Sequence, residues 1–247
     1  MATARKRKQP KATAARDFRR FLPSWKQLVW TLFLGTLAGM IGLAWLVNRT
    51  QIPSPNTFAQ ANSTVVYYAD GKHQVGVIGD YNRVEVPLAQ VPLNTQRAVL
   101  AAEDRSFYEH SGFSWSGIAR AVVNNITTGS AQGGSTITQQ YVKLAYLSSE
   151  RSIVRKLKEL VLSIKLETSD SKDQILQNYL NTVYLGRGAY GLQAGARAYF
   201  GLDVQQLNIA QSAMLAALLK SPEGFAPEKN LDRLKLRWNY VLDGMVD

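Results

Sequence analysis

The sequence predicts a mainly α-helical domain that carries a small β-hairpin and is preceded by one membrane-spanning helix. Residues 27–47 contain no charged side chain and would form a helix of about 30 Å, the thickness of the hydrocarbon core of a bilayer. Two β-rich runs flank an Asp-Gly turn at residues 70–71, and from residue 94 onward apolar residues recur at three- and four-residue spacing. These observations separate an anchor from a helical domain of roughly 150 residues.

The flanks of the membrane segment predict its orientation. The tail of residues 1–26 holds nine basic residues and one acidic residue, so it carries +8 of the formal net charge of +11. Basic flanks stay in the cytoplasm, which places residues 48–247 outside it. Trp25, Trp30 and Trp45 lie near the segment ends, where indole rings favour the lipid–water interface. A cleaved signal peptide is the main alternative, but residues 46–49 offer no small-x-small cleavage site.

Composition excludes several kinds of site. The chain has no cysteine, which excludes disulfides, thiolate metal sites and cysteine nucleophiles. Only His73 and His110 are present, so a metal centre built from several histidines is not expected. Because most of the positive charge lies in the tail, nucleic acid is not expected as a partner.

Beyond the membrane segment the sequence divides into three parts. Residues 48–63 form a polar linker with two prolines, and residues 64–93 hold the hairpin and a connector bounded by Pro87 and Pro92. Residues 94–247 form the helical domain. Within it we expect helices over residues 152–167, 172–183 and 204–219, with Asp203 as the N-cap of the last.

Glu103 and Asp104 are the first candidates for chemistry. Residues 95–102 favour a helix, so Glu103 lies near its C-terminal end. There the negative end of the helix dipole raises the proton affinity of a carboxylate, and a raised pKa suits a general base near neutral pH. A solvated helix end is the simpler interpretation of such a pair, and a lone His110 is more often a structural hydrogen-bonder.

A Gly-Gly loop followed by a helix start, at residues 132–143, is the second candidate. Thr136 is a good N-cap, and Gln139 would complete a capping box. The same helix start would present free amides and hydroxyls to sugar or phosphate oxygens, with Lys143 as a nearby cation. No Gly-Lys-Ser/Thr follows, so a nucleotide P-loop does not fit. A plain helix cap and a binding site fit this spacing equally well.

Charged residues that interrupt an apolar stripe in residues 151–167 are the third candidate. Arg155 and Glu159 stand at i,i+4 on one helix face, beside Lys156. As a surface ion pair they would contribute about 0.5 kcal/mol of stability. A sharper interpretation puts a carboxylate and a guanidinium beside a pyrophosphate, and the pair alone does not decide between the two.

In order and spacing these segments resemble the peptidoglycan glycosyltransferase family, found in class A penicillin-binding proteins and as monofunctional transglycosylases. The family motifs are E-D-x-x-F-x-x-H-x-G, G-G-S-T-I-x-Q-Q, R-K-x-x-E, K-x-x-I-L-x-x-Y-L-N and a Gly-rich segment that runs from Y-G to Y-F-G. The chain supplies them at residues 103–112, 133–140, 155–159, 172–181 and 190–201. The resemblance covers residues 64–247.

The resemblance implies a lysozyme-like fold and a reaction between lipid-linked sugars. The donor would be a growing glycan on a polyprenyl pyrophosphate and the acceptor lipid II, joined with inversion into a β-1,4 linkage. Glu103 would be the catalytic base, and Glu159 would orient cations or a metal. A divalent cation, Mg²⁺ or Mn²⁺, is a candidate cofactor, and no organic cofactor is expected. The residues implied in substrate binding are Asp104, Phe107, His110, Gly134, Ser135, Thr136, Gln139, Gln140, Lys143, Arg155, Lys156 and Asn181.

The resemblance also implies a cellular setting. The protein would cross the bacterial plasma membrane once, with lipid II, lipid-linked glycan and the bilayer as partners and cell-division or elongation proteins as further candidates. Residue 247 falls inside a predicted helix, which suggests the N-terminal part of a bifunctional class A penicillin-binding protein, with a short monofunctional enzyme as the alternative. One alternative is a lysozyme-like glycan hydrolase, which would not need the cations Lys143, Arg155 and Lys156. The other is an inactive membrane scaffold.

The chain departs from the family pattern at three places. Ser114 stands where Asp is usual, Gly195 replaces a common Ala, and Asn230-Leu231 stands where Asn-Pro is frequent. None of these positions is an expected catalytic group.

Overall fold

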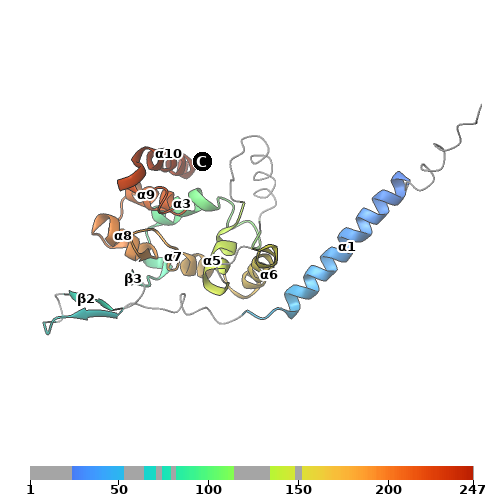
Figure 1. Cartoon of the computed structure of the whole chain (residues 1–247), viewed down its shortest axis with the longest axis horizontal. Helices are drawn as coiled ribbons and strands as arrows, with labels where there is room; N and C mark the ends of the chain where they lie inside the picture. The colour runs from blue at the N-terminus through green and yellow to red at the C-terminus, as the bar shows by residue number, and fades with distance from the viewer. Residues whose placement is uncertain are drawn as a thin grey trace, which may run out of the picture. The chain divides into compact units, whose positions relative to one another are not determined.

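The computed structural model describes residues 24–52, 64–70, 74–78, 82–113, 134–147 and 152–246 (Figure 1). The chain divides into two compact units, Met1–Leu46 and Val47–Asp247. The tail through residue 23, most of the linker, and Ser114 lie outside the described residues. The predicted roles of the tail and the linker therefore stay predictions.

Helix α1 (Trp25–Arg49) contains the predicted membrane segment and extends it by two residues at each end. Its most apolar stretch has a mean hydropathy of 1.8, and none of its residues is buried. Among the described residues it is the one helix long and apolar enough to cross a membrane. A helix with apolar side chains exposed on all sides requires an apolar surrounding, which a bilayer supplies.

The second unit begins with the predicted hairpin. Strands β1 (Thr64–Tyr67) and β2 (Gln74–Ile78) pair antiparallel, with residue 64 opposite residue 78. A second small sheet was not predicted: β3 (Asn82–Arg83) pairs in parallel with β4 (Ala189–Tyr190). The two segments of this pair are about a hundred residues apart, beyond the reach of local patterns.

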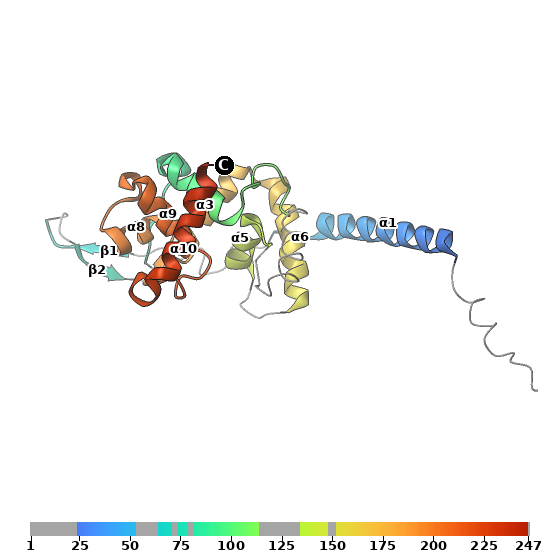
Figure 2. The same cartoon turned by 90° about the horizontal axis from the view of Figure 1, so that it is seen from above.

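Helices form the body of the second unit, as predicted. They are α3 (Leu93–Glu103), α5 (Ile137–Tyr146), α6 (Ile153–Ser169), α7 (Lys172–Leu180), α8 (Leu192–Phe200), α9 (Ile209–Leu218) and α10 (Pro227–Val246), with short 3₁₀ turns η2 (Leu88–Gln90) and η3 (Val204–Gln206). Helices α3, α9 and α10 pack against one another (Figure 2), while α5 packs against α6 and α7 (Figure 1). Tyr179, Phe107 and Ile137 are among the largest side chains of the core.

The expected single helix over residues 204–219 is wrong. Asp203 caps only the three-residue turn η3, and α9 starts afresh at Ile209. The reason is a second capping box: the Asn208 side chain accepts a hydrogen bond from Gln211 N, and the Gln211 side chain bonds back to Asn208 N. A local side-chain cap of this kind competes with continuation of the helix.

Two of the three departures from the family pattern, Gly195 and Asn230-Leu231, lie among the described residues. At Gly195 of α8 an added Cβ would lie 2.4 Å from Leu185 Cδ1, so the Leu185 side chain occupies that space. At Asn230 the backbone leaves the helical region, with φ −143° and ψ 58°, so α10 contains a kink just before Leu231.

Candidate active site

Glu103 is the last residue of α3, and its carboxylate lies in a mostly buried polar setting. The side chain is 11% exposed. Its Oε2 accepts a hydrogen bond from Gln140 Nε2 of α5 at 2.8 Å. Its Oε1 is buried and has no hydrogen-bond partner among the described residues, although Arg237 Nη2 of α10 approaches it to 3.6 Å. One oxygen is thus held in place while the other is left uncommitted.

The pKa of Glu103 is raised above its ordinary value of 4.5, and burial is the largest cause. The hydrogen bond from Gln140 and the positive charges of Arg237 and Lys220 oppose this rise, and the charge of Asp104 adds to it. The direction agrees with the prediction, but the main cause is loss of water around the carboxylate rather than the helix dipole. The interpretation as a solvated helix end is wrong, because neither carboxylate is solvent-exposed.

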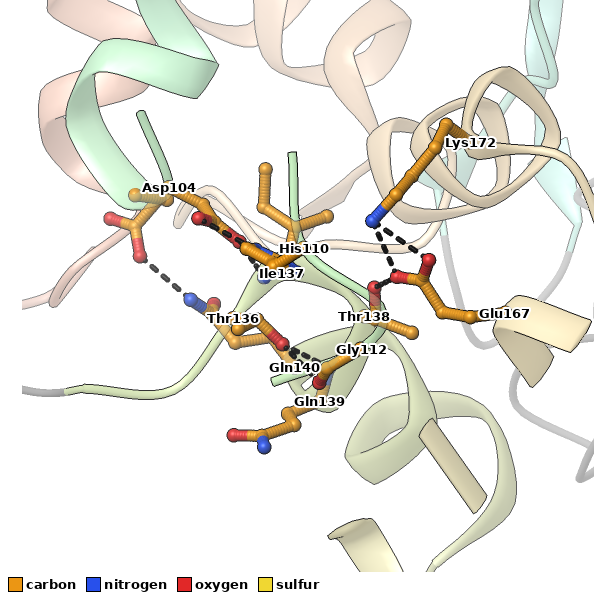
Figure 3. A network of polar contacts seen from close by, with 11 residues as sticks. Asp104, His110, Gly112, Thr136, Ile137, Thr138, Gln139, Gln140, Glu167 and Lys172 are labelled. Atoms are coloured by element: carbon orange, nitrogen blue, oxygen red, sulfur yellow. Dashed lines mark hydrogen bonds and ion pairs between the residues drawn. The ribbon is translucent and has the colours of Figure 1, made fainter. Parts of the chain in front are cut away.

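Asp104 and His110 build the turn that follows α3. The Asp104 carboxylate lies 2.9 and 3.0 Å from His110 Nε2 and accepts a hydrogen bond from the N–H of Ile137, the first residue of α5, at 3.1 Å. The Nδ1 of His110 is buried without a partner in the described part of the chain. Gly112 completes the turn at φ +83°, where a Cβ would lie 2.9 Å from the Ser163 backbone. Asp104 therefore fixes the start of α5 against the end of α3 (Figure 3).

The start of α5 is capped as predicted. Thr136 Oγ1 accepts from Gln139 N at 3.2 Å and donates to Gly112 O at 3.0 Å. The reciprocal half of the capping box, a bond donated by Thr136 N to the Gln139 side-chain oxygen, is absent among the described residues. Thr136 and Gln139 are buried, whereas Gly134 and Ser135 are half-buried. Their predicted roles in substrate binding stay predictions.

The amide of Gln140 is oriented at both ends. Its Nε2 donates to Glu103, and its Oε1 accepts from the Tyr179 hydroxyl at 3.2 Å. Tyr179 is fully buried, and burial raises its pKa well above 10.0, so the hydroxyl stays protonated as a donor. The amide therefore has to present its N–H group to the carboxylate.

Glu159 is buried between two cations of its own helix, α6. Arg155 Nη1 contacts its Oε1, and Lys156 Nζ lies 2.9 Å from its Oε2. Lys156 also donates to Ser135 Oγ at 2.9 Å, which joins α6 to the start of α5. With Glu159 3% exposed and Arg155 19% exposed, the interpretation as a surface ion pair is wrong.

Lys143 is exposed on α5 and has no polar partner among the described residues. Arg155 and Lys156, by contrast, both face Glu159, so within the described residues Lys143, unlike them, is not committed to a carboxylate.

Two further residues expected to bind substrate are buried and contact protein groups, and their predicted roles in substrate binding stay predictions. Phe107 is 1% exposed and belongs to the core, so it supports the turn after α3. Asn181, which caps α7, accepts from Val86 N and donates to Val86 O, both at 2.9 Å. Two residues on, Leu88 N donates to Gln177 Oε1 at 2.8 Å. We call the two bonds between Asn181 and Val86 the Asn181 clamp.

Sequence reasoning missed Arg237 as a neighbour of Glu103. Its Nη2 donates to Ala102 O at 2.7 Å, and its guanidinium stacks 4.4 Å from the Tyr240 ring centroid. It also missed the buried pair of Glu167 and Lys172. A lone Arg in a basic helix gives no sequence signal, although Lys172 opens one of the family motifs.

A divalent cation held by the protein does not fit the described residues. They contain no group of three or more Asp, Glu or His side chains that could hold one. Glu159, the expected ligand, has both oxygens in contact with cations of the protein. The divalent cation stays a prediction.

A buried carboxylate of raised pKa, oriented by an amide and accompanied by cations on two helices that pack together, is the arrangement typical of a general acid–base site. A comparison with known protein families identifies the family to which this site belongs. Residues 71–246 match the Transglycosylase family, and the chain belongs to that family.

Curated relatives are similar over most of this chain. Penicillin-binding protein 1A of Mycolicibacterium smegmatis is 45% identical over 212 residues, covering 83% of this chain and 27% of that protein. Penicillin-binding protein 1A of Mycobacterium tuberculosis is 42% identical over 233 residues, covering 91% of this chain and 28% of that protein. The chain thus spans little more than a quarter of the length of these relatives.

A crystal structure of penicillin-binding protein 1A from Haemophilus influenzae matches 75% of this chain and 18% of that chain, at 25% identity and a TM-score of 0.39. A similarity of that size supports no argument about the fold. The family match confirms the resemblance seen in the sequence and favours neither the hydrolase nor the scaffold. Together with α1, the relatives support a membrane-anchored protein.

Proposed function

We propose that this chain is a membrane-anchored peptidoglycan glycosyltransferase that polymerises lipid II into β-1,4 glycan chains with inversion and releases polyprenyl pyrophosphate. The observation that supports this best is Glu103, a buried carboxylate of raised pKa oriented by Gln140 in a member of the transglycosylase family. The chain would be the N-terminal part of a bifunctional class A penicillin-binding protein, in keeping with relatives of which it spans little more than a quarter.

Glu103 would act as the general base. The 4-hydroxyl of the acceptor sugar attacks the anomeric carbon of the donor, the bond from that carbon to the pyrophosphate oxygen breaks, and the hydroxyl proton passes to Glu103. Attack opposite the leaving group inverts the anomeric centre. A base whose pKa lies nearer to the working pH accepts a proton more readily, which suits the raised pKa of Glu103.

The departing pyrophosphate needs positive charge as the glycosidic bond breaks. Lys143 is the first candidate, because it is exposed and without a partner in the described part of the chain. Arg155 and Lys156 would follow, oriented for this task by Glu159. The capped start of α5, with Thr136, would hold sugar or phosphate oxygens.

The proposed orientation puts the N-terminus in the cytoplasm and residues 48–247 outside it, at the bacterial plasma membrane. Both substrates are lipids, so an anchor confines enzyme and substrates to the same surface. Cell-division or elongation proteins are proposed as partners on the family resemblance alone.

Glu103→Gln tests the proposal, because it keeps the size and hydrogen bonding of the side chain and removes the base. We expect polymer formation from lipid II by the full chain in detergent to fall at least about a hundredfold. Glu109→Gln, an exposed carboxylate of the following turn, is the matched control and should behave as wild type. A folded Glu103→Gln protein that keeps more than about a tenth of wild-type turnover would refute the role of Glu103.

A further inference from the structure

An ion pair between Glu167 and Lys172 joins four segments of the domain near Glu103. Glu167, in the last turn of α6, is 5% exposed, and its two oxygens lie 2.7 and 2.8 Å from Lys172 Nζ. Lys172 is the first residue of α7, and its ammonium group lies 4.4 Å from the ring centroid of Phe107. Thr138 of α5 is fully buried and donates to Glu167 Oε1 at 2.5 Å. The pair therefore links α5, α6 and α7 (Figure 3), and through Phe107 it reaches the turn after α3.

These contacts close into a ring with the contact that Asp104 makes. Asp104 lies in the same turn as Phe107 and accepts the N–H of Ile137, the residue before Thr138. Phe107 of this turn contacts Lys172, Lys172 pairs with Glu167, and Glu167 accepts a hydrogen bond from Thr138 of α5. The N–H of Ile137 in α5 then donates to Asp104, which lies in the same turn as Phe107. The first turn of α5 is thus held on two sides, and all of these contacts are largely shielded from water.

The two groups that meet in the site, the Glu103 carboxylate and the Gln140 amide, lie next to the two ends of this ring of contacts. Glu103 immediately precedes the turn at one end, and Gln140 lies two residues beyond Thr138 at the other. The 2.8 Å bond between the Gln140 amide and the Glu103 carboxylate depends on how α5 sits against the end of α3. The pair is mostly shielded from water, with the Lys172 side chain 20% exposed, and desolvation offsets much of its attraction, so it contributes less to net stability than to holding one arrangement.

We propose that Glu167 and Lys172 are positioning residues for glycosyl transfer, which set the Gln140 amide against the Glu103 carboxylate. The inference rests on the proposed function of Glu103 as the base. Loosening the ring takes away the hydrogen bond that favours ionised Glu103. The charges that also face Glu103 come from elsewhere: Arg237 on α10, Lys220 beyond α9, and Asp104 beside it. They are not carried by α5 and stay in place.

The test removes the link to α5 and keeps both charges. Thr138→Val deletes the hydroxyl that donates to Glu167. Thr168→Val is the matched control, since that hydroxyl is exposed and bonds to Lys165 O of its own helix. For the full chain in detergent acting on lipid II, we expect Thr138→Val to lower kcat about tenfold and leave KM nearly unchanged. The acidic limb of kcat should move to higher pH, because the ionised base is less stabilised. The control should match wild type.

A second variant guards against a folding defect. Glu167→Gln with Lys172→Met removes both charges at similar volume, a change that buried pairs often tolerate, and keeps an acceptor for Thr138. We expect a lower kcat and the same displacement of the acidic limb, with thermal melts near wild type.

The outcomes distinguish a failure of the positioning role from a failure of the proposed function. Folded variants with wild-type kcat and pH profile overturn the positioning role, and so does a lower kcat without displacement of the acidic limb. Failure of both variants to fold would also overturn it, because the pair would then serve the fold alone. A wild-type chain that makes no polymer from lipid II overturns the proposed function and the positioning role together.

Discussion

Arg237 offers a direct way to perturb the basicity of Glu103 without touching the carboxylate. Its Nη2 lies 3.6 Å from Glu103 Oε1. At that distance two unit charges attract by about 5 kcal/mol for an effective dielectric constant of about 20. This is an upper limit, because the two side chains keep 14% and 11% exposure. An opposite charge this close typically favours the ionised form by about 1–4 kcal/mol.

Arg237→Met keeps the length of the side chain and removes the charge. We expect the acidic limb of kcat to move to higher pH, because the ionised base loses a favourable charge. Each 1.4 kcal/mol of lost stabilisation of ionised Glu103 reduces turnover on the acidic limb about tenfold. The hydrogen bond to Ala102 O is also lost, which costs about 1 kcal/mol of stability. Lys235→Met, an exposed lysine of the same helix, is the matched control.

The assay is polymerisation of lipid II at saturating substrate across the acidic limb, with thermal melts of each protein. The control should keep the wild-type profile. A folded Arg237→Met protein whose acidic limb coincides with that of wild type would refute the electrostatic coupling to Glu103.

Three further predictions follow from other parts of the structure. Glu103→Gln should melt above wild type at neutral pH: the folded state raises the pKa of Glu103, so its ionisation costs stability as pH rises from the ordinary value of 4.5 through the folded pKa. The difference in Tm should vanish below that window, and a difference independent of pH would contradict the reasoning. Lys143→Ala and Arg155→Ala should each raise the activation barrier of glycosyl transfer by about 2–4 kcal/mol and lower kcat more than they raise KM. Wild-type turnover by both folded variants would refute the proposed role of these cations in stabilising the leaving pyrophosphate. Leu231→Pro should leave the Tm unchanged or raise stability by up to about 1 kcal/mol, because Asn230 before it is already non-helical; a melt several degrees lower would count against this.

Features set by neighbours in sequence could be predicted from the sequence. The Thr136 cap depends on residues three apart, the hairpin on two runs about one turn, and α6 on apolar periodicity. Where two local signals competed, the prediction failed. Asn208 starts a new helix inside a stretch whose apolar spacing alone suggested continuity.

The site was harder to predict, because the motifs name residues without saying what they face. Glu103 and Asp104 are adjacent in sequence, yet the first points to Gln140 and the second to His110. Burial is the main cause of the raised pKa of Glu103, and the end of α3 where it lies is contacted by Arg237 of α10, more than a hundred residues further along the chain. The Asn181 clamp lies in a family motif just as catalytic groups do, so spacing could not separate its role from binding.

The segment before α3 is fixed to α7 at two successive positions. In chain order Val86 stands between α1 and α3, and both of its backbone groups bond to the Asn181 side-chain amide. Leu88 N adds a bond to Gln177 of the same helix. After the β3–β4 pair, these are the next contacts in chain order, so we expect them to resist a pull from the N-terminal side before it reaches the end of α3, where Glu103 lies.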